Sequence, residues 1–424
     1  MGRNLRCEQT LFYDETVEKV QHLRRGESFL WWSLRISRVI KSTVPAYFDH
    51  NATTNLCPTA REAWLRAYEQ YWHNASSLYR EAGMTSQALE AAREQMGDLL
   101  GVEAERVVFT SGATESNNTL FAGLSKCLSA DALVAISAIE HPSVRESARA
   151  WLGRGRVVEI PVDDQGVTQP EVLQDILNQH SPALVSIMAA NNESGVLQPW
   201  PELLKLCRQT GTRFHSDAAQ WIGKLSAAEL GACDYLTGSA HKFGGPKGIG
   251  FLILADAEES FPLLHGGPQE NGRRAGTENY PAIAAMAAAL ESAQESLPET
   301  IVTQPGLRDA FIAQMKSAFP ELRVISEEAP RLWNTALMVM PRHDNLKWLT
   351  RLTRRGFAIS TGSACSSGKE GSSVVVQALG ASWEELKRVV RVSGGWETSQ
   401  EDWQALAAAF EEVGHELDAG GRPQ

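Results

Sequence analysis

A lysine in a glycine-rich turn is the first residue whose setting favours chemistry. The segment "GSAHKFGGPKG", Gly238 to Gly248, places Lys242 directly after a predicted strand. Most lysines simply lie on the surface. A lysine at the carboxyl end of a sheet strand lies where α/β proteins bind ligands, and its amine can form a Schiff base with an aldehyde cofactor. Lys242 is therefore a candidate for covalent catalysis.

An enzyme that uses pyridoxal phosphate also needs a carboxylate and an anion site. Asp217 in "FHSDAAQ" follows a predicted strand, and Gln220 lies three residues further on. The Asp217 carboxylate can keep a pyridine nitrogen protonated, although a helix N-cap is the plainer alternative. "FTSGATESNN" predicts a strand, a turn and a helix whose N-terminus binds phosphate, with Thr114 as the expected cap. Ordinary strand-to-helix connections share this pattern.

Three further residues lie in or after predicted strands. His141 in "EHPSV" suits an aromatic lid on a planar cofactor with acid–base duty, and a capping histidine is the alternative. Asn192 in "ANNESG" is an amide in a turn, which is weak evidence alone. Arg391 in "VRVSGG" can bind a substrate carboxylate through two hydrogen bonds, whereas a surface ion pair is the commoner use of arginine.

A cysteine near the C-terminus lies in a segment that is poorly suited to burying it. Cys365 occupies "TGSACSSGKEG", where glycine and serine replace the apolar neighbours of a structural cysteine. Such neighbours suit a thiol that travels, and a free surface cysteine is the alternative. The chain has six cysteines and no Cys-x-x-Cys pair, which argues against a zinc site and for a reducing, cytosolic setting.

The elements that must position these residues alternate between strand and helix. Segments such as "PELLKLCRQTG" have helical apolar spacing and separate several of the short β-branched runs. This alternation predicts a mainly parallel sheet covered on both faces. The predicted strands are "VVFT", "ALVAIS", "RVVEIPV", "ALVSIMAA", "TRFHS", "DYLTGS" and "GIGFLIL".

The domain organisation follows from the same pattern. An Ala-rich stretch after Gly276 reads as a helix that leads into a second region of mixed helix and strand. We expect an N-terminal extension of unknown role, a large α/β domain whose first residues pack with the small domain, a small α+β domain, and a tail. Their expected ranges are 1–44, 45–300, 301–416 and 417–424.

Composition excludes several classes of function. The 424 residues are 43% hydrophobic and 21% charged, as in an ordinary globular enzyme. A formal net charge of −11 argues against broad nucleic-acid binding, which depends on clustered Lys and Arg. No apolar run reaches the ~18 residues of a membrane span, and residues 1–44 fit neither a signal peptide nor a transit peptide.

Several segments occur in an order that is typical of one family. They are "YFDHNATT", "FTSGATESNN", "EHPSV", "ANNESG", "FHSDAAQ", "GSAHKFGGPKGIG", "GGPQENGRRAGTEN" and "GSACSS". From about Ala46 to Glu416 the chain resembles the NifS/IscS-type cysteine desulfurases, which are class V, fold-type I pyridoxal phosphate enzymes. This resemblance implies a large, mainly parallel α/β domain that binds the cofactor and a smaller α+β C-terminal domain that carries the cysteine loop.

The resemblance also implies a role for each candidate residue. Lys242 is similar to the Schiff-base lysine and Cys365 to the cysteine that accepts sulfur. Asp217, Gln220 and His141 are similar to the residues that contact the ring nitrogen, the ring hydroxyl and the ring face. The remaining implied roles are phosphate binding by Ala113, Thr114, Ser239 and His241, a contact across a dimer interface by Thr277, and substrate-carboxylate binding by Asn192, which also lies near the cofactor, and Arg391.

The activity implied by the resemblance is removal of sulfur from L-cysteine, giving L-alanine and a persulfide on Cys365. The sulfur then passes to an acceptor protein, an iron–sulfur scaffold or a sulfur carrier for thio-cofactor synthesis or tRNA thiolation. The implied cofactor is pyridoxal 5′-phosphate and the implied assembly a cytoplasmic homodimer. No metal, membrane or direct nucleic-acid contact is expected.

Two other functions are compatible with parts of the pattern. Another class V enzyme, a selenocysteine lyase or an aminotransferase, would share Lys242 and Asp217, but an aminotransferase needs no mobile thiol. A scaffold without activity would have no use for Lys242, Asp217 and His141 together. The segments "HNASSLY", "HGGPQE" and "KEGSSVV" depart from the family pattern and bear on the choice of acceptor and the behaviour of the cysteine loop.

Overall fold

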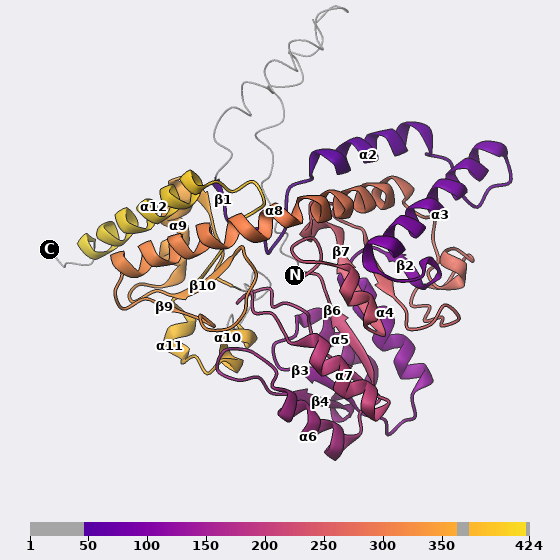
Figure 1. Cartoon of the computed structure of the whole chain (residues 1–424), viewed down its shortest axis with the longest axis horizontal. Helices are drawn as coiled ribbons and strands as arrows, with labels where there is room; N and C mark the ends of the chain where they lie inside the picture. Colours follow the sequence, from indigo (N-terminus) through magenta and orange to yellow (C-terminus); the bar gives the residue numbers. More distant parts are fainter. Residues whose placement is uncertain (1–45, 363–372, 421–424) are drawn as a thin grey trace, which may run out of the picture. The chain divides into compact units, whose positions relative to one another are not determined.

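The structure is a computed structural model that describes residues 46–362 and 373–420. Seven strands form its main sheet, in the order β2-β8-β7-β6-β5-β3-β4 (Figure 1). The pairings from β7 through β6, β5 and β3 to β4 are parallel, and β8 is antiparallel to both β7 and β2. The strands are β2 (Val107–Thr110), β3 (Val134–Ser137), β4 (Val157–Ile160), β5 (Leu184–Ser186), β6 (Arg213–Asp217), β7 (Tyr235–Ser239) and β8 (Gly250–Ile253). The predicted mainly parallel α/β fold is confirmed.

Helices bury apolar faces against this sheet. In α7, Leu203, Leu204 and Cys207 lie on one face and are all buried in the same core as Phe214 of β6. The predicted apolar face of this helix is therefore confirmed. The helices before the long helix α8 are α2 (Pro58–Gln70), α3 (Arg80–Leu100), α4 (Ala113–Cys127), α5 (Pro142–Leu152), α6 (Pro170–His180) and α7 (Trp200–Thr210).

The helix α8 (Tyr280–Ala318) belongs to two hydrophobic cores. It begins at Asn279, whose side chain caps the helix by accepting a hydrogen bond from the backbone N–H of Ala282. Its first half adds residues such as Met286 to the core of the large sheet, and its second half adds Phe311 to another core. In Figure 1 the helix runs from beside α2 to beside α12, and it packs on both.

The second core is built on a three-stranded antiparallel sheet, in the order β12-β10-β9. Its register places Leu337 opposite Arg391. A separate parallel pair joins β1 (Ala46–Tyr47) to β11 (Phe357–Ala358), so the first described residues lie in this part of the fold. The other elements here are β9 (Arg323–Val324), β10 (Thr335–Val339), α9 (Asn345–Arg354), α10 (Val374–Ala378), α11 (Trp383–Leu386), β12 (Val389–Ser393) and α12 (Gln400–Ala419).

Short 3-10 helices connect several elements, and the one after β7 carries the candidate lysine. They are η1 (Ala104–Arg106), η2 (Arg154–Arg156), η3 (Ala228–Ala232), η4 (Ala240–Lys242) and η5 (Glu270–Gly272). Within the described ranges, no helix combines the length and the apolar character that crossing a bilayer requires.

Candidate active site

The candidate active site is a cavity of about 690 Å³ at the carboxyl ends of the strands of the large sheet. Parallel strands end at one edge, so residues far apart in sequence meet there. The structure brings ten of the predicted residues to this cavity: Ala113, Thr114, His141, Asn192, Asp217, Gln220, Ser239, His241, Lys242 and Arg391.

Lys242 ends η4, directly after β7, and is half-buried. Its Nζ donates to the backbone carbonyl oxygens of Asn51 (2.7 Å) and Ala52 (2.9 Å). Two carbonyl oxygens therefore position the amine at the cavity. A simple surface lysine, the plainer alternative, does not describe this residue.

Asp217 ends β6 and is 4% exposed. Its Oδ2 accepts a hydrogen bond from Nδ2 of Asn117 (3.0 Å), and its Oδ1 accepts from the backbone N–H of Ala219 (3.0 Å). No helix among the described elements starts at Asp217, so the alternative of a helix N-cap is wrong. Thr237 in turn donates to Oδ1 of Asn117 at 2.9 Å, which fixes the orientation of the Asn117 amide. The carboxylate is therefore held rigidly at the wall of the cavity.

His141 caps α5, as one of its two interpretations expects, and it also lines the cavity. A contact between its ring and a planar cofactor stays a prediction. Its Nδ1 accepts from the backbone N–H of Ser143 (3.1 Å), which leaves the proton of the neutral ring on Nε2. Burial lowers the pKa of His141, and the charge of Lys242 acts in the same direction while Asp217 opposes it. The ring is accordingly neutral near pH 7.

The residue before His141 is a buried acid to which the sequence analysis assigned no role. Glu140 is 2% exposed, lines the cavity, and has no hydrogen-bond partner among the described residues for either carboxyl oxygen. Burial, and then the charge of Asp217, raise the pKa of Glu140 well above its ordinary value. Burial and the neighbouring carboxylate therefore both favour the protonated form of Glu140. Glu140 belongs to the motif "EHPSV", and this was the sequence signal that could have pointed to it.

The N-terminus of α4 forms a cradle for an anion. Its N-cap is Gly112, with no side-chain cap, and Thr114 is the second helical residue, so the prediction that Thr114 caps the helix is wrong. Gly112 has φ of 149°, and an added Cβ would lie 3.4 Å from Oγ of Ser239. Helix N-termini of this kind bind phosphate through backbone N–H groups. Glycine at 112 keeps the space beside Ser239 open.

Two unpaired polar atoms mark another part of the cavity wall. Arg391 is 2% exposed and donates to the backbone oxygen of Asn192 (2.9 Å) and to Oδ1 of Asp49 (2.5 Å). The Nε atom of Arg391 and the Oδ1 atom of Asn192 are buried without a hydrogen-bond partner in the described part of the chain. Arg391 is buried and its ion-pair partner Asp49 is 19% exposed, so a surface ion pair does not describe Arg391. The unpaired donor and acceptor suit a polar ligand.

His241 and Thr277 differ in how the structure places them. His241 lines the cavity, its Nδ1 lies 3.1 Å from Oγ1 of Thr53, and burial together with the charges of nearby lysines lowers its pKa to about 4. Thr277 instead lines a small cavity of about 60 Å³, together with Ser111 and Gly248. Within one chain, therefore, Thr277 does not join the other predicted residues.

Cys365 lies outside the described residues. The residues on either side of the gap do line the cavity: Gly362 before it and Val374 and Val375 after it. Glu193 lies between these two sides, because its Oε2 accepts from Oγ of Ser373 (2.6 Å) and an added Cβ on Gly362 would lie 3.0 Å from the same atom. Glu193 is a further residue of the site that sequence reasoning passed over, although "ANNESG" contains it.

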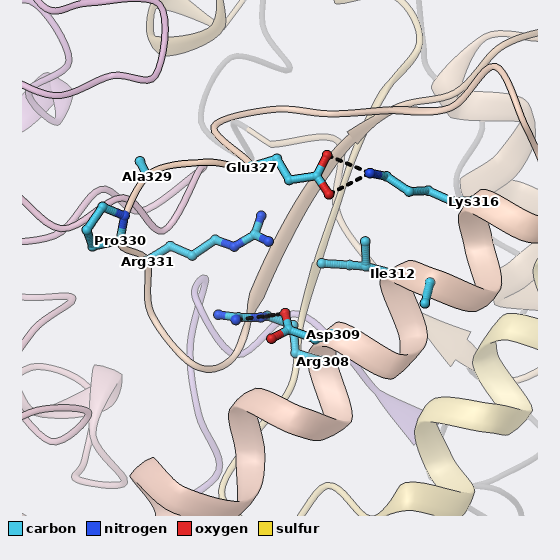
Figure 2. A pocket seen from close by; sticks show the side chains of 9 residues that line it. Arg308, Asp309, Ile312, Lys316, Glu327, Ala329, Pro330 and Arg331 are labelled. Carbon is cyan, nitrogen blue, oxygen red and sulfur yellow. Dashed lines mark hydrogen bonds and ion pairs between the residues drawn. The ribbon is translucent and has the colours of Figure 1, made fainter.

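A second cavity, of about 550 Å³, lies beside the last turns of α8 (Figure 2). Two ion pairs line it, Arg308 with Asp309 (2.8 Å) and Lys316 with Glu327 (2.5 Å). Figure 2 shows the guanidinium of Arg331 between these pairs. No residue predicted for chemistry lines this cavity. We therefore place the candidate active site in the larger cavity.

A metal centre has no counterpart in the part of the chain that the structure describes, where no group of three or more His, Cys, Asp or Glu side chains is arranged to hold an ion. The four described cysteines, Cys57, Cys127, Cys207 and Cys233, are free thiols.

Comparisons with known proteins identify the family of the chain. The chain is 34% identical over 371 residues to the cysteine desulfurase IscS of Dictyoglomus turgidum, covering 87% of this chain and 94% of the relative. A solved structure titled "NIFS-LIKE PROTEIN" matches with a TM-score of 0.81 and 31% identity, over 88% of this chain and 100% of that one. "SspA in complex with cysteine" matches with a TM-score of 0.70 and 31% identity, over 82% and 98%. The model of one family, described as Aminotransferase class-V, matches residues 46–406, and the chain belongs to this family.

Proposed function

We propose that this chain is a cysteine desulfurase that uses pyridoxal 5′-phosphate. It takes the sulfur of L-cysteine, releases L-alanine and keeps the sulfur as a persulfide on Cys365. One observation carries the proposal: Lys242 and Asp217, at the ends of adjacent parallel strands, line one cavity. The relatives support it, since one is named as a cysteine desulfurase and another was solved with cysteine.

The residues of the cavity suit the parts of the cofactor. The uncapped N-terminus of α4, with Ser239 and His241 nearby, suits the phosphate. The Asp217 carboxylate suits the pyridine nitrogen and the Gln220 amide suits the ring hydroxyl. When bound, the cofactor supplies an aldehyde for a lysine amine and an electron sink for charge that develops on the substrate. His141, neutral and with its proton on Nε2, suits the face of the ring.

Three side chains act on the substrate: two bind it and one removes a proton from it. We assign binding of its carboxylate to Arg391 and Asn192, which line the cavity together and are joined by a hydrogen bond from the Arg391 guanidinium to the backbone oxygen of Asn192. Arg391 is held for this task by Asp49. The Lys242 amine then removes the proton from Cα, a role for which a positioned amine beside the substrate is suited.

Sulfur transfer needs a nucleophile, and we assign it to the Cys365 thiolate. An S–S bond forms between Cys365 and the substrate sulfur while the Cβ–S bond of the substrate breaks. The electron pair of that bond stays on Cβ, which takes up a proton, so alanine forms without an external oxidant or reductant. Gly362 and Val374, on either side of the undescribed segment, line the cavity and support this assignment.

The proposed enzyme is a homodimer. Large apolar side chains are exposed on α2 and on the connection that follows it, and a groove of about 510 Å³ there is lined by Trp72 and by Thr277. Exposed apolar patches of this kind mark association surfaces. A second copy seated on this face would let Thr277 complete the neighbouring cavity. The exposed residues are Leu65 (54%), Tyr68 (66%), Trp72 (65%), Leu78 (104%) and Tyr79 (49%).

The sulfur on Cys365 passes to an acceptor protein, either an iron–sulfur scaffold or a sulfur carrier. We place this reaction in the cytoplasm, because a free catalytic thiol and its persulfide persist in a reducing compartment.

The decisive experiment follows sulfur from cysteine to Cys365. Purified protein that is loaded with pyridoxal phosphate is incubated with L-cysteine. Alanine is then quantified, and the mass of the peptide that contains Cys365 is measured by mass spectrometry. A gain of one sulfur atom on that peptide, absent in Cys365→Ala, supports the proposal. A Cys365→Ala variant that forms alanine and sulfide at the full rate would overturn it, and a parallel assay with L-selenocysteine tests the selenocysteine lyase alternative.

A further inference from the structure

A buried lysine that has no part in the proposed chemistry lies beside the cavity. Lys224 is 1% exposed and follows Gln220 by four residues. We propose that Lys224 is a positioning residue: it fixes the side-chain amide of Gln220 so that the amide turns its N–H group, and not its oxygen, toward the ligand. This inference rests on the proposed function, in which Gln220 donates to the ring hydroxyl.

The contacts of Lys224 are specific. Its Nζ donates to Oε1 of Gln220 at 2.5 Å and to Oδ1 of Asn51 at 3.1 Å. Both acceptors are neutral amide oxygens, and no carboxylate of the described residues forms an ion pair with this amine. A lysine is rarely buried without a charged partner. We therefore explain the burial of Lys224 by the hydrogen bonds through which it orients the side-chain amides of Gln220 and Asn51.

The other end of the Gln220 amide is fixed as well. Its Nε2 donates to the backbone oxygen of Asn51 at 2.9 Å, and a carbonyl oxygen can only accept. A half-turn of the amide would set Oε1 against that oxygen and Nε2 against the amine of Lys224. Both contacts would then be lost. One hydrogen of Nε2 is used by Asn51, and its second hydrogen remains for a ligand in the cavity that Gln220 lines.

The Asn51 side chain cannot turn away from Lys224, because hydrogen bonds to three other residues fix its amide. Its Nδ2 donates to the backbone oxygen of Asn192 (3.2 Å) and to Oγ1 of Thr335 (2.9 Å). Its Oδ1 accepts from Nδ2 of Asn334 (3.0 Å) in addition to Lys224. The two amide oxygens that hold the lysine are thus parts of a rigid network.

The charges around Lys224 agree with this role. The charged groups that act on it are Lys242 of η4 and Arg391 of β12, and both are cations. Burial, followed by these two charges, lowers the pKa of Lys224 well below its ordinary value. An amine donates to both oxygens in either protonation state, so the orientation of Gln220 does not depend on the charge.

The test uses Lys224→Met, which keeps the unbranched shape and most of the length of the side chain and removes the donors. Apoprotein is titrated with pyridoxal phosphate, and the dissociation constant is measured by absorbance. We expect the constant to rise by roughly tenfold or more, since Gln220 no longer donates a hydrogen bond to the ring oxygen, which is negatively charged when the hydroxyl is deprotonated. The pH midpoint of the visible absorbance band of the loaded protein should rise by about one unit. Lys205→Met, an exposed lysine of α7, is the matched control and should change neither value.

A double-mutant cycle with Gln220→Leu separates positioning from general support of the fold. If Lys224 acts through Gln220, adding Lys224→Met to Gln220→Leu changes the dissociation constant and the midpoint little. Equal effects of Lys224→Met in both backgrounds, or none in the parent protein, would overturn the inference. Urea unfolding of each variant shows which molecules are folded. A parent protein that binds no cofactor at all would instead refute the proposed function, so the two failures differ.

Discussion

The Nζ atom of Lys242 lies 2.7 Å from the backbone carbonyl oxygen of Asn51, and Nε2 of Gln220 donates to the same oxygen at 2.9 Å. The backbone N–H of Asn51 donates to Oγ of Ser393 in β12 at 3.1 Å. One residue thus links the candidate catalytic lysine to the three-stranded sheet. Asn51 lies in the motif "YFDHNATT", where nothing in the sequence indicates these contacts.

Replacement of Asn51 by alanine should destabilise the protein. The change leaves the buried amide of Asn334, the amine of Lys224 and the hydroxyl of Thr335 short of a partner. Each unsatisfied buried group costs about 1–3 kcal/mol, so we expect the free energy of unfolding to fall by at least that amount. Urea denaturation measures it. Asn178→Ala, on the exposed face of α6, should change it little, and equal values for the two variants would contradict the prediction.

Asp217→Asn should bind the cofactor but react slowly. The new amide cannot hold the proton on a pyridine nitrogen, and its NH₂ group conflicts with the Nδ2 donor of Asn117. We expect kcat to fall by roughly 10²–10³-fold, the usual loss when a charge that stabilises a transition state is removed. Alanine formation under saturating cysteine measures it. Asp98→Asn on the exposed side of α3 is the control, and a rate like that of the parent protein for Asp217→Asn would argue against its proposed role.

Arg391→Lys should separate substrate binding from chemistry. Lysine keeps the positive charge beside Asp49 but lacks the planar fork and the Nε donor of arginine. We expect KM for L-cysteine to rise by roughly tenfold, because one hydrogen bond to a charged group is lost. A smaller change is expected in kcat. A fall in kcat with KM unchanged would place Arg391 elsewhere in the reaction.

The stability of the protein should depend on pH through His215. Burial lowers the pKa of this fully buried histidine from 6.5 to about 4, against the charge of Asp217. Between these values the unfolded chain binds a proton that the folded chain does not, so the free energy of unfolding falls as the pH falls from 6.5 to about 4. The contribution is about 1.4 kcal/mol for each pH unit. His215→Gln should remove it from the slope measured by urea denaturation at several pH values, and an unchanged slope would contradict the assignment.

A charge on the apolar face around α2 should dissociate the proposed dimer. Trp72 is 65% exposed and stacks on His73 with ring centroids 4.2 Å apart. Burying a glutamate at this position of an interface is unfavourable, so Trp72→Glu should shift the protein toward the monomer in sedimentation experiments. Trp383→Glu is the matched control, since Trp383 is 58% exposed on α11. A monomeric parent protein, or equal behaviour of both variants, would contradict the proposed interface.

Much of the fold was predictable because its signals are local. Each strand of the large sheet lies in a segment predicted as a strand, except that β6 runs one residue further, to Asp217. The helical spacing of Leu203, Leu204 and Cys207 predicts the buried face of α7. The domain ranges stay a prediction. The expected boundary at residue 300 falls inside α8, where Pro298 and Pro305 lie within one continuous helix. Proline is a local signal for a break, and packing on two cores overrides it here.

The site was predictable where a motif ends a strand, as at Asp217 and Lys242. The contacts that orient these groups join residues far apart in sequence, such as Lys224 with Asn51, so no local spacing of residues predicts them. The cap of α4 was misread for a similar reason. Thr114 has the right side chain for a cap, but the positive φ of Gly112 shifts the start of the helix by two residues.

The pairing of β1 with β11 has a consequence for the order in which the molecule assembles. Ala46 pairs with Phe357, and the backbone oxygen of Phe48 accepts from the N–H of Ser393. A growing chain exposes its early segments long before their partners have been made, and such distant contacts form slowly. The strands of the large sheet find their neighbours earlier. We therefore expect refolding to be biphasic, with native secondary structure gained before the capacity to bind pyridoxal phosphate.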